Sequence, residues 1–320
     1  MDILPYLPQN KEAAEKFETG WHLFKKFQDY KLSQPLFSEA IFLVPDFALA
    51  YHCRGICFVH LSEVERGMSD LRKARELGLD RPEYHYGMAV GHAAQNDNEA
   101  ALESFNTAIK TKPEMGEAYE ERADLHIKLG NDDDALRDYS KAIELNVFRI
   151  GHCYYKRALV YISRNELEKA LADLNEAKIF GNKDWNIYYN RGHCNYKLNR
   201  LEKAAEDYRT VLFLNPFLAD AYYCLGNTLY EMQDFDGAIH NHSQVIAKEP
   251  EAFEGYFARG LAHLTKEEFD FAIEDFEKAI SLNPEDAEAH YLLSEAHAGK
   301  GQEEKAQTAL QRAKDLGFED

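Results

Sequence analysis

Apolar and small residues recur along the chain with the spacing of two short amphipathic helices, and the whole arrangement returns about every 34 residues. It is clearest in residues 253–284, which read FEGYFARGLAHLTKEEFDFAIEDFEKAISLNP. Tyr256 and Gly260 are four residues apart and share one face of a first helix. After a polar break, Ala272 and Phe276 share one face of a second helix. The pattern therefore predicts a helix–turn–helix unit.

Approximate copies of this unit fill the chain from residue 14 to residue 320. Residues 1–13 precede them as a leader, which Pro5 and Pro8 should keep extended or disordered. The fixed period predicts one all-α array of nine units rather than two globular domains, and only the fourth unit is one residue longer than the rest. The units start at Ala14, Ala48, Pro82, Gly116, Gly151, Trp185, Ala219, Phe253 and Ala287.

Within a unit, small and bulky residues alternate between the two helices. With positions numbered 1 to 34, position 8 is small in every unit except the first, where Trp21 stands, and position 24 is usually bulky. If the helices form an antiparallel hairpin that turns near positions 15 and 16, positions 8 and 24 face each other. A small residue opposite a large one lets the helices approach closely and interlock.

These residues resemble the tetratricopeptide repeat, a 34-residue helix–turn–helix. The family pattern has small residues at position 8, alanine at 20 and 27, an aromatic residue at 24 and proline at 32. Gly260, Ala272, Phe276, Ala279 and Pro284 match it in the unit that starts at residue 253. The resemblance implies an α–α superhelix, a right-handed solenoid whose first helices line the concave face.

Charged residues at two positions of the unit change together. Position 7 is arginine in five units, and the same five units have aspartate at position 23. The hairpin places these positions opposite each other, so we expect structural ion pairs that are partly buried. The expected pairs are Arg54 with Asp70, Arg122 with Asp138, Arg157 with Asp173, Arg191 with Asp207, and Arg259 with Asp275.

Positions 5, 9 and 12 of the first helices form a stripe beside the packed face, which we call the inner stripe. The family resemblance implies that the inner stripe lines a concave groove. Position 5 is aromatic in five consecutive C-terminal units, which suits an extended peptide or a partner helix. These aromatics could instead pack between repeats. The expected groove residues are Tyr155, Leu159, Ile162, Tyr189, His193, Tyr196, Tyr223, Asn227, Tyr230, Phe257, Leu261 and Leu264.

The charge balance narrows the expected partners. The chain has 56 acidic and 37 basic residues and a formal net charge of −19. That balance disfavours nucleic acid and anionic membranes, and it favours an apolar protein or peptide with basic flanks. The five cysteines are scattered without a CxxC pair, and no apolar stretch approaches 18 residues. We therefore expect a cytoplasmic protein.

Motifs for catalysis are missing from the sequence. It contains no Gly-rich phosphate loop, HExxH, GxSxG or zinc-knuckle spacing. We expect no enzyme activity, no cofactor and no metal site. The predicted function is a non-catalytic scaffold for protein–protein interaction. The alternative is a structural component that assembles or self-associates, as a homo-oligomer, through its terminal repeats.

Overall fold

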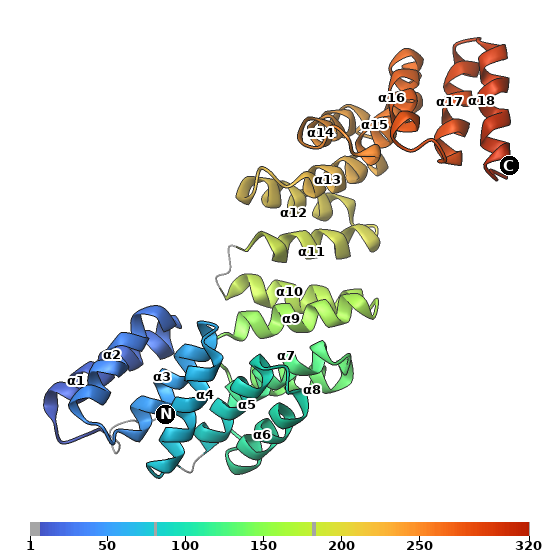
Figure 1. Ribbon diagram of the computed structural model, residues 1–320. Helices are drawn as coiled ribbons and strands as arrows, with labels where there is room; N and C mark the ends of the chain where they lie inside the picture. Colours follow the sequence, from blue (N-terminus) through green and yellow to red (C-terminus); the bar gives the residue numbers. More distant parts are fainter. Residues whose placement is uncertain (1–6, 80–81, 181–183, 320) are drawn as a thin grey trace. The chain divides into compact units, whose positions relative to one another are not determined.

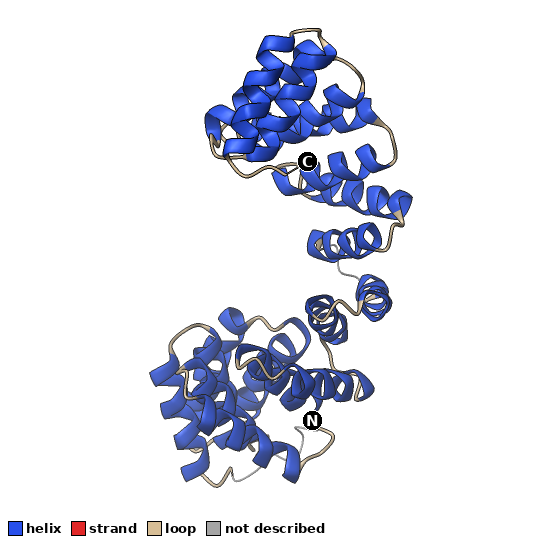
Figure 2. Cartoon of the chain, turned by 90° about the vertical axis from the view of Figure 1, so that its right-hand side faces the viewer, coloured by secondary structure: helices blue, strands red, loops and turns tan. Residues whose placement is uncertain are grey.

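The computed structural model describes residues 7–79, 82–180 and 184–319. Within these residues the regular structure consists of eighteen α-helices and one π-helical turn, η2, with no strand among them (Figures 1 and 2). Consecutive helices such as α3 and α4, or α15 and α16, lie side by side as pairs. The predicted all-α fold class is confirmed. No helix in the described ranges is long and apolar enough to cross a bilayer.

The chain divides into two compact units, Met1–Val160 and Tyr161–Asp320, and the division falls within α9 (Ile150–Ser163). The elements before α9 are α1 (Lys11–His22), η2 (Leu23–Phe27), α2 (Tyr30–Leu43), α3 (Ala48–His60), α4 (Val64–Glu76), α5 (Pro82–Ala94), α6 (Asn98–Thr111), α7 (Gly116–Lys128) and α8 (Asp132–Glu144). The helices after α9 are α10 (Leu167–Ile179), α11 (Trp185–Lys197), α12 (Leu201–Leu214), α13 (Ala219–Glu231), α14 (Phe235–Lys248), α15 (Phe253–Thr265), α16 (Phe269–Leu282), α17 (Ala287–Gly299) and α18 (Glu303–Asp315).

Seven of the nine expected unit starts coincide with the first residue of an α-helix. Of the other two, α9 begins one residue early and α1 begins at Lys11, inside the segment expected to be extended. The early start of α1 follows from its cap, because the Asn10 side chain accepts a hydrogen bond of 3.1 Å from the Ala13 amide. Residues 1–6 of the expected leader lie outside the described residues.

The turn between paired helices uses one backbone conformation throughout. The residue at position 15 has a positive φ in each of the nine units, between 51° and 75°. This left-handed conformation ends the first helix and reverses the chain. Glycine fills it only at Gly130 and Gly301. Three other units use asparagine, which tolerates the conformation better than most residues.

Small residues of the first helices face bulky residues of the second helices, as predicted for positions 8 and 24. A Cβ atom on Gly260 would lie 3.0 Å from Cε1 of Phe276, and a Cβ atom on Gly226 would lie 2.5 Å from Cε1 of His242. Phe276 and His242 are almost completely buried. A side chain at Gly226 would therefore clash with the ring on the paired helix, and one at Gly260 would be tightly packed against it.

Each arginine at position 7 joins more groups than the sequence predicted. Nε and Nη2 of Arg191 donate to the carboxylate of Asp207 at 2.5–3.1 Å. Its third nitrogen, Nη1, donates at 2.9 Å to the side-chain oxygen of Asn175 in the preceding second helix. The guanidinium carbon also lies 5.5 Å from the ring centre of Tyr188. One side chain thus contacts its own repeat and the repeat before it.

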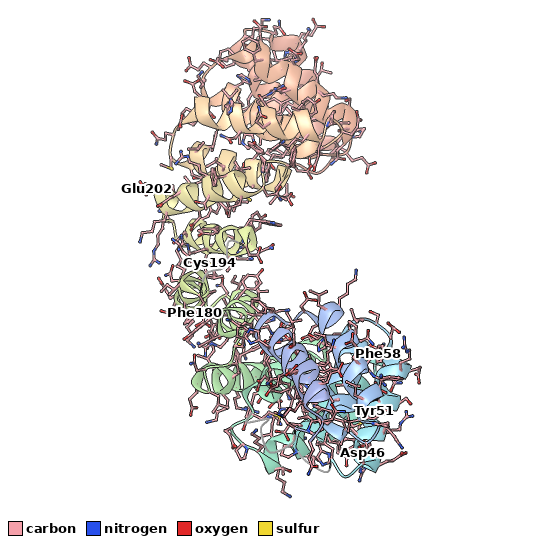
Figure 3. All side chains as sticks on the ribbon, turned by 90° about the vertical axis from the view of Figure 1, so that its left-hand side faces the viewer. Asp46, Tyr51, Phe58, Phe180, Cys194 and Glu202 are labelled. Carbon is pink, nitrogen blue, oxygen red and sulfur yellow. The ribbon has the colours of Figure 1, made fainter. Side chains whose placement is uncertain are left out.

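The same arrangement recurs along both units. Arg54 donates to Asp70 and to Ser38 and lies 5.3 Å from the ring of Tyr51, a residue labelled in Figure 3. The corresponding partners of Arg122 are Asp138, Asn106 and Tyr119, and those of Arg259 are Asp275, Ser243 and Tyr256.

The fifth arginine, Arg157, lies beside the division between the two units. It contacts Ser140 and the ring of Tyr154, both in the first unit. Its expected partner Asp173 is buried in the second unit, on α10. The pairing of Arg157 with Asp173 stays a prediction.

Replacing Asp207 by alanine tests how much these ion pairs contribute to stability. Asp207 is 2% exposed, so its loss leaves the Arg191 guanidinium buried without its main partner. We expect the free energy of unfolding to fall by about 3–5 kcal/mol in urea denaturation followed by circular dichroism. As a control, Glu168→Ala removes the exposed partner of Arg200 and should cost less than about 1 kcal/mol. Equal losses for the two variants would show that the buried pair has no special role.

Candidate functional site

In the second unit, the aromatic residues at position 5 of the inner stripe are partly buried. Tyr189 on α11 packs edge-on against Tyr208, with ring centres 6.0 Å apart. Phe257 on α15 packs in the same way against Phe276 at 6.1 Å. The Tyr189 hydroxyl also lies 3.6 Å from Sγ of Cys224 in the following repeat. One part of each ring is thus used in packing, and the remainder stays accessible on the inner stripe.

The other expected groove residues are distributed between the two units. Nine of the twelve lie on α11, α13 and α15 in the second unit, and all nine are partly buried. Among them the Tyr230 hydroxyl shares a hydrogen bond of 2.9 Å with Oγ1 of Thr265. On α9, Tyr155 and Leu159 belong to the first unit and Ile162 to the second. The grouping of all twelve residues in one groove therefore stays a prediction.

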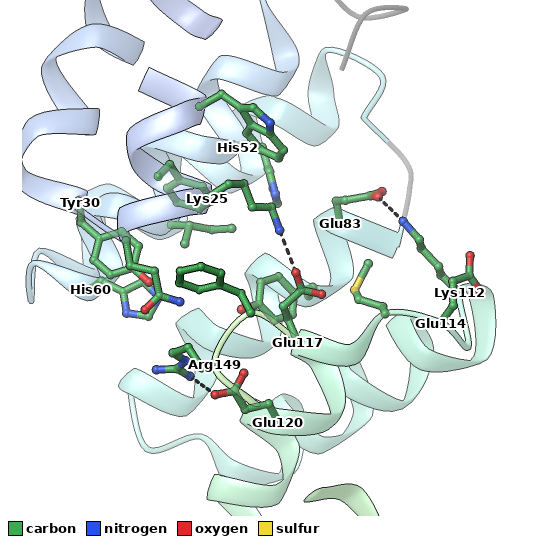
Figure 4. A pocket seen from close by; sticks show the side chains of 17 residues that line it. Lys25, Tyr30, His52, His60, Glu83, Lys112, Glu114, Glu117, Glu120 and Arg149 are labelled. Atoms are coloured by element: carbon green, nitrogen blue, oxygen red, sulfur yellow. Dashed lines mark hydrogen bonds and ion pairs between the residues drawn. The ribbon is translucent and has the colours of Figure 1, made fainter. Parts of the chain in front are cut away.

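A cavity of about 330 Å³ lies in the first unit (Figure 4). Residues at position 5 of the inner stripe line it, as in the expected groove, but they belong to earlier repeats. His52, Tyr86 and Glu120 line it, and they occupy position 5 on α3, α5 and α7. The remaining lining residues are Trp21, Phe24, Lys25, Gln28, Tyr30, Ile56, His60, Glu83, Lys112, Glu114, Met115, Glu117, Phe148 and Arg149.

Charged side chains of opposite sign alternate around this cavity (Figure 4). Nζ of Lys25 lies 2.9 Å from Oε1 of Glu117. On another side, Nζ of Lys112 lies 3.3 Å from Glu83. Nη2 of Arg149 lies 2.6 Å from Oε1 of Glu120 and contacts Glu121 as well. The cavity thus combines ion pairs with apolar walls.

Glu120 is a buried carboxylate with incomplete hydrogen bonding. The residue is 2% exposed, and burial raises its pKa to about 7, although the nearby Arg149 guanidinium opposes the change. Nη2 of Arg149 approaches Oε1 of Glu120 closely, yet that oxygen accepts no well-directed hydrogen bond from any residue that the structure describes. The site therefore retains an acceptor that a further donor could use.

His52 forms a neutral part of the wall. It is 5% exposed, and burial lowers its pKa to about 4, so its imidazole is uncharged at neutral pH. Its Nδ1 atom finds no hydrogen-bond partner among the residues that the structure describes. The ring lies close to Gly87 of α5, where an added Cβ atom would come within 3.2 Å of Cε1 of His52. Glycine at this point lets the two helices close one side of the cavity.

The mouth of the cavity is built by features that do not follow the repeat. The π-helical turn η2 and Gln28, whose φ is 51°, carry Lys25 toward α7. Phe148, 62% exposed, and Arg149 come from the end of the single unit that is one residue longer than the others. The longer unit was the sequence signal that could have pointed to this site. Its significance was missed because the prediction followed the aromatic residues farther along.

The site offers acidic and aromatic groups, but no metal cluster. In the part of the chain that the structure describes, no three His, Cys, Asp or Glu side chains are grouped so that they could hold a metal ion. The aromatic walls include Trp21, whose ring centre lies 5.5 Å from Nζ of Lys25. Such an arrangement of carboxylates and rings can bind a cation by ion pairing and by cation–π attraction.

Family models match four segments of the chain. Models described as tetratricopeptide repeat match residues 86–146, 253–286 and 275–308, and a model described as TPR repeat matches residues 195–233. Part of the cavity wall, including Tyr86 and Glu120, falls within the first of these matches.

Known proteins resemble parts of the chain. A Protein SGT1 homolog from Oryza sativa subsp. japonica is 36% identical over 28% of this chain and 24% of its own length. Human Serine/threonine-protein phosphatase 5 is 30% identical over 32% of this chain and 20% of its own length. The chain thus spans about a fifth to a quarter of the length of these relatives.

A crystal structure shares the fold over about half of the chain. It is that of YrrB, described as a TPR protein with an unusual peptide-binding site. The match is 25% identical and covers 56% of this chain and 92% of YrrB, with a TM-score of 0.51.

Replacing Glu120 by glutamine tests how much the burial of its charge costs in stability. Its pKa is raised on folding, so its contribution to stability is present below the pKa of the unfolded chain and is lost as pH rises through about 7. Glutamine does not titrate. The free energy of unfolding of the variant, minus that of the wild type, should therefore increase between pH 5 and pH 8, by up to about 3 kcal/mol.

Urea denaturation at the two pH values measures this difference. Glu103→Gln is the control, because Glu103 is exposed on α6 and its charge stays in water in both states. If the difference in the free energy of unfolding between Glu120→Gln and the wild type does not change with pH, the expected cost of burying the charge is contradicted.

Proposed function

This chain is a tetratricopeptide repeat protein, and from that premise we propose that it binds a segment of a partner protein along the inner stripe of its first helices. The observation that carries the proposal is the cavity of the first unit. His52, Tyr86 and Glu120 place it on position 5 of three successive repeats. A concave site with apolar walls and a few polar groups is the usual form of a binding site.

The chemistry of the inner stripe supports an apolar segment with basic flanks as the ligand. In the second unit, the partly buried rings of Tyr189, Tyr223 and Phe257 offer apolar surface. In the first unit, four carboxylates and three basic side chains line the cavity, and the whole chain carries a formal charge of −19. Such a surface attracts basic partners and repels nucleic acid.

The comparisons support binding rather than a particular pathway. YrrB, which shares the fold, is described as having a peptide-binding site. The matches to the SGT1 homolog and to phosphatase 5 cover about a fifth to a quarter of those proteins, so we carry over none of their activities. The proposed role is that of a scaffold and contains no catalytic step.

A pair of phenylalanine variants tests the cavity as a binding site. Phe148 lines its mouth and is 62% exposed, whereas Phe42 on α2 is 84% exposed and lies outside the lining. Phe148→Ala should weaken binding by about 1–2 kcal/mol, because an aromatic residue at the centre of an interface contributes strongly. Phe42→Ala should leave it unchanged.

The measurement uses partners captured on the immobilised full chain, followed by calorimetry with each purified partner. Equal affinities for the wild type and the Phe148→Ala variant would remove the cavity from the proposed interface.

A second pair of variants tests the inner stripe of the second unit. His193 and Asn227 occupy position 9 there. Alanine at both sites should weaken the binding of the same partners at least about fivefold, since it removes the polar contacts of these two side chains. Lys203→Ala with Glu206→Ala, both exposed on α12, is the control. If the two double variants bind alike, the interface does not include position 9 of these repeats.

A further inference from the structure

The cavity of the first unit already holds a cation of the chain's own. Nζ of Lys25 lies 2.9 Å from Oε1 of Glu117 and 5.5 Å from the ring centre of Trp21 (Figure 4). Lys25 belongs to η2, whereas Glu117 lies 92 residues later, in the first turn of α7. A lysine between a carboxylate and an aromatic face has the surroundings that such a site would offer to a cationic ligand.

We propose that this cavity is a receptor for one lysine or arginine side chain of the bound segment, and that Lys25 occupies the place of that side chain in the free protein. The inference rests on the proposed function and adds to it the chemical identity of one ligand residue.

Glu117 and Glu120 supply the negative charge of the receptor. They are three residues apart on α7 and therefore share one face of the helix. Burial is the largest single effect on the pKa of Glu117 and raises it, but the charge and hydrogen bond of the Lys25 ammonium, together with a backbone hydrogen bond, lower it by more in sum, so the net pKa is lowered and the carboxylate remains charged. Glu114 adds another carboxylate to the lining.

The buried oxygen of Glu120 provides an independent indication of a missing donor. Glu120 is 2% exposed, and Arg149 approaches its Oε1 atom at 2.6 Å, but among the described residues no group donates a well-directed hydrogen bond to that atom. A buried acceptor of this kind is costly unless a partner completes it. Lysine and arginine side chains supply N–H donors with a positive charge, and their aliphatic stems can pack against Ile56 and Met115 in the wall.

Lys25 can be displaced at small cost. Its side chain is 41% exposed and that of Glu117 is 43% exposed, so their ion pair is screened by water. A ligand cation that enters the cavity would exchange one ion pair for another and would add its own apolar contacts. An acidic ligand would instead place its charge beside Glu114, Glu117 and Glu120. The other two basic residues of the lining, Lys112 and Arg149, already pair with Glu83 and Glu120.

Seven-residue peptides bound to the full chain test the proposal. Four libraries carry lysine, arginine, norleucine or glutamate at the centre, with mixed residues elsewhere. The chain has two tryptophans, so Trp185→Phe leaves Trp21 at the cavity as the only indole reporter. We expect the lysine and arginine libraries to change Trp21 fluorescence, and their best peptides to bind about tenfold more weakly when the central residue becomes norleucine.

Three variants of the Trp185→Phe protein test whether the preference for lysine or arginine peptides arises in this cavity. Glu117→Gln should weaken the binding of the lysine peptides about tenfold. Lys25→Met should strengthen them about two- to fivefold, because the internal competitor is gone. Lys16→Met is the matched control for Lys25: Lys16 on α1 pairs with Glu39 and has a similar exposure of 39%, and its loss should change nothing.

The proposal is overturned if norleucine peptides bind as tightly as lysine peptides, or if Lys25→Met weakens binding. Uncharged peptides that change Trp21 fluorescence would leave the proposed function standing without this receptor. If no library changes the fluorescence of Trp21, the receptor is also excluded. The proposed function is then decided separately by comparing the binding of natural partners to the wild type and to Phe148→Ala.

Discussion

The arginine at position 7 is the contact that most directly connects one repeat to the next. Arg191 binds Asp207 in its own repeat and Asn175 in the preceding one, and it lies beside the ring of Tyr188. A buried guanidinium is tolerated because each of its three nitrogens donates to an acceptor. A repeat array has no central core that fixes the whole chain, so its register depends on local contacts of this kind.

Packing fixes some positions of the repeat and leaves others free to differ. Positions 7, 8 and 24 are restricted by ion pairs and by close helix contacts, as at Gly226 opposite His242. The inner stripe has fewer such restrictions. It carries Tyr189, Tyr223 and Phe257 in the second unit, but His52 and Glu120 in the first. One fold thus presents two different surfaces at equivalent positions, and recognition depends on the residues placed there.

Sequence reasoning predicted what is repeated and missed what occurs once. Matched residues at positions 7 and 23 indicated ion pairs, and the structure places Arg54 with Asp70 and Arg259 with Asp275. The acceptor for the third nitrogen of each arginine, at position 25 of the preceding repeat, was missed because it is serine in some repeats and asparagine in others, as at Ser38 and Asn106. The cavity was missed for another reason: the π-helical turn that carries Lys25 and the extra residue near Arg149 have no copies from which a pattern could be read.

Glu120 supports the proposal that the inner stripe of the first unit is a binding surface as well as a packing surface. A glutamine or an apolar residue at this position would avoid the burial of a charge, and burial has already raised the pKa of Glu120 to about 7. Among the described residues, its ion-pair contact comes from Arg149, and Arg149 is shared with Glu121. Ion pairs that only stabilise the fold, such as Arg191 with Asp207, are completed by directed hydrogen bonds on both partners. The incomplete set at Glu120 lies beside open space, which is where a bound donor can complete it.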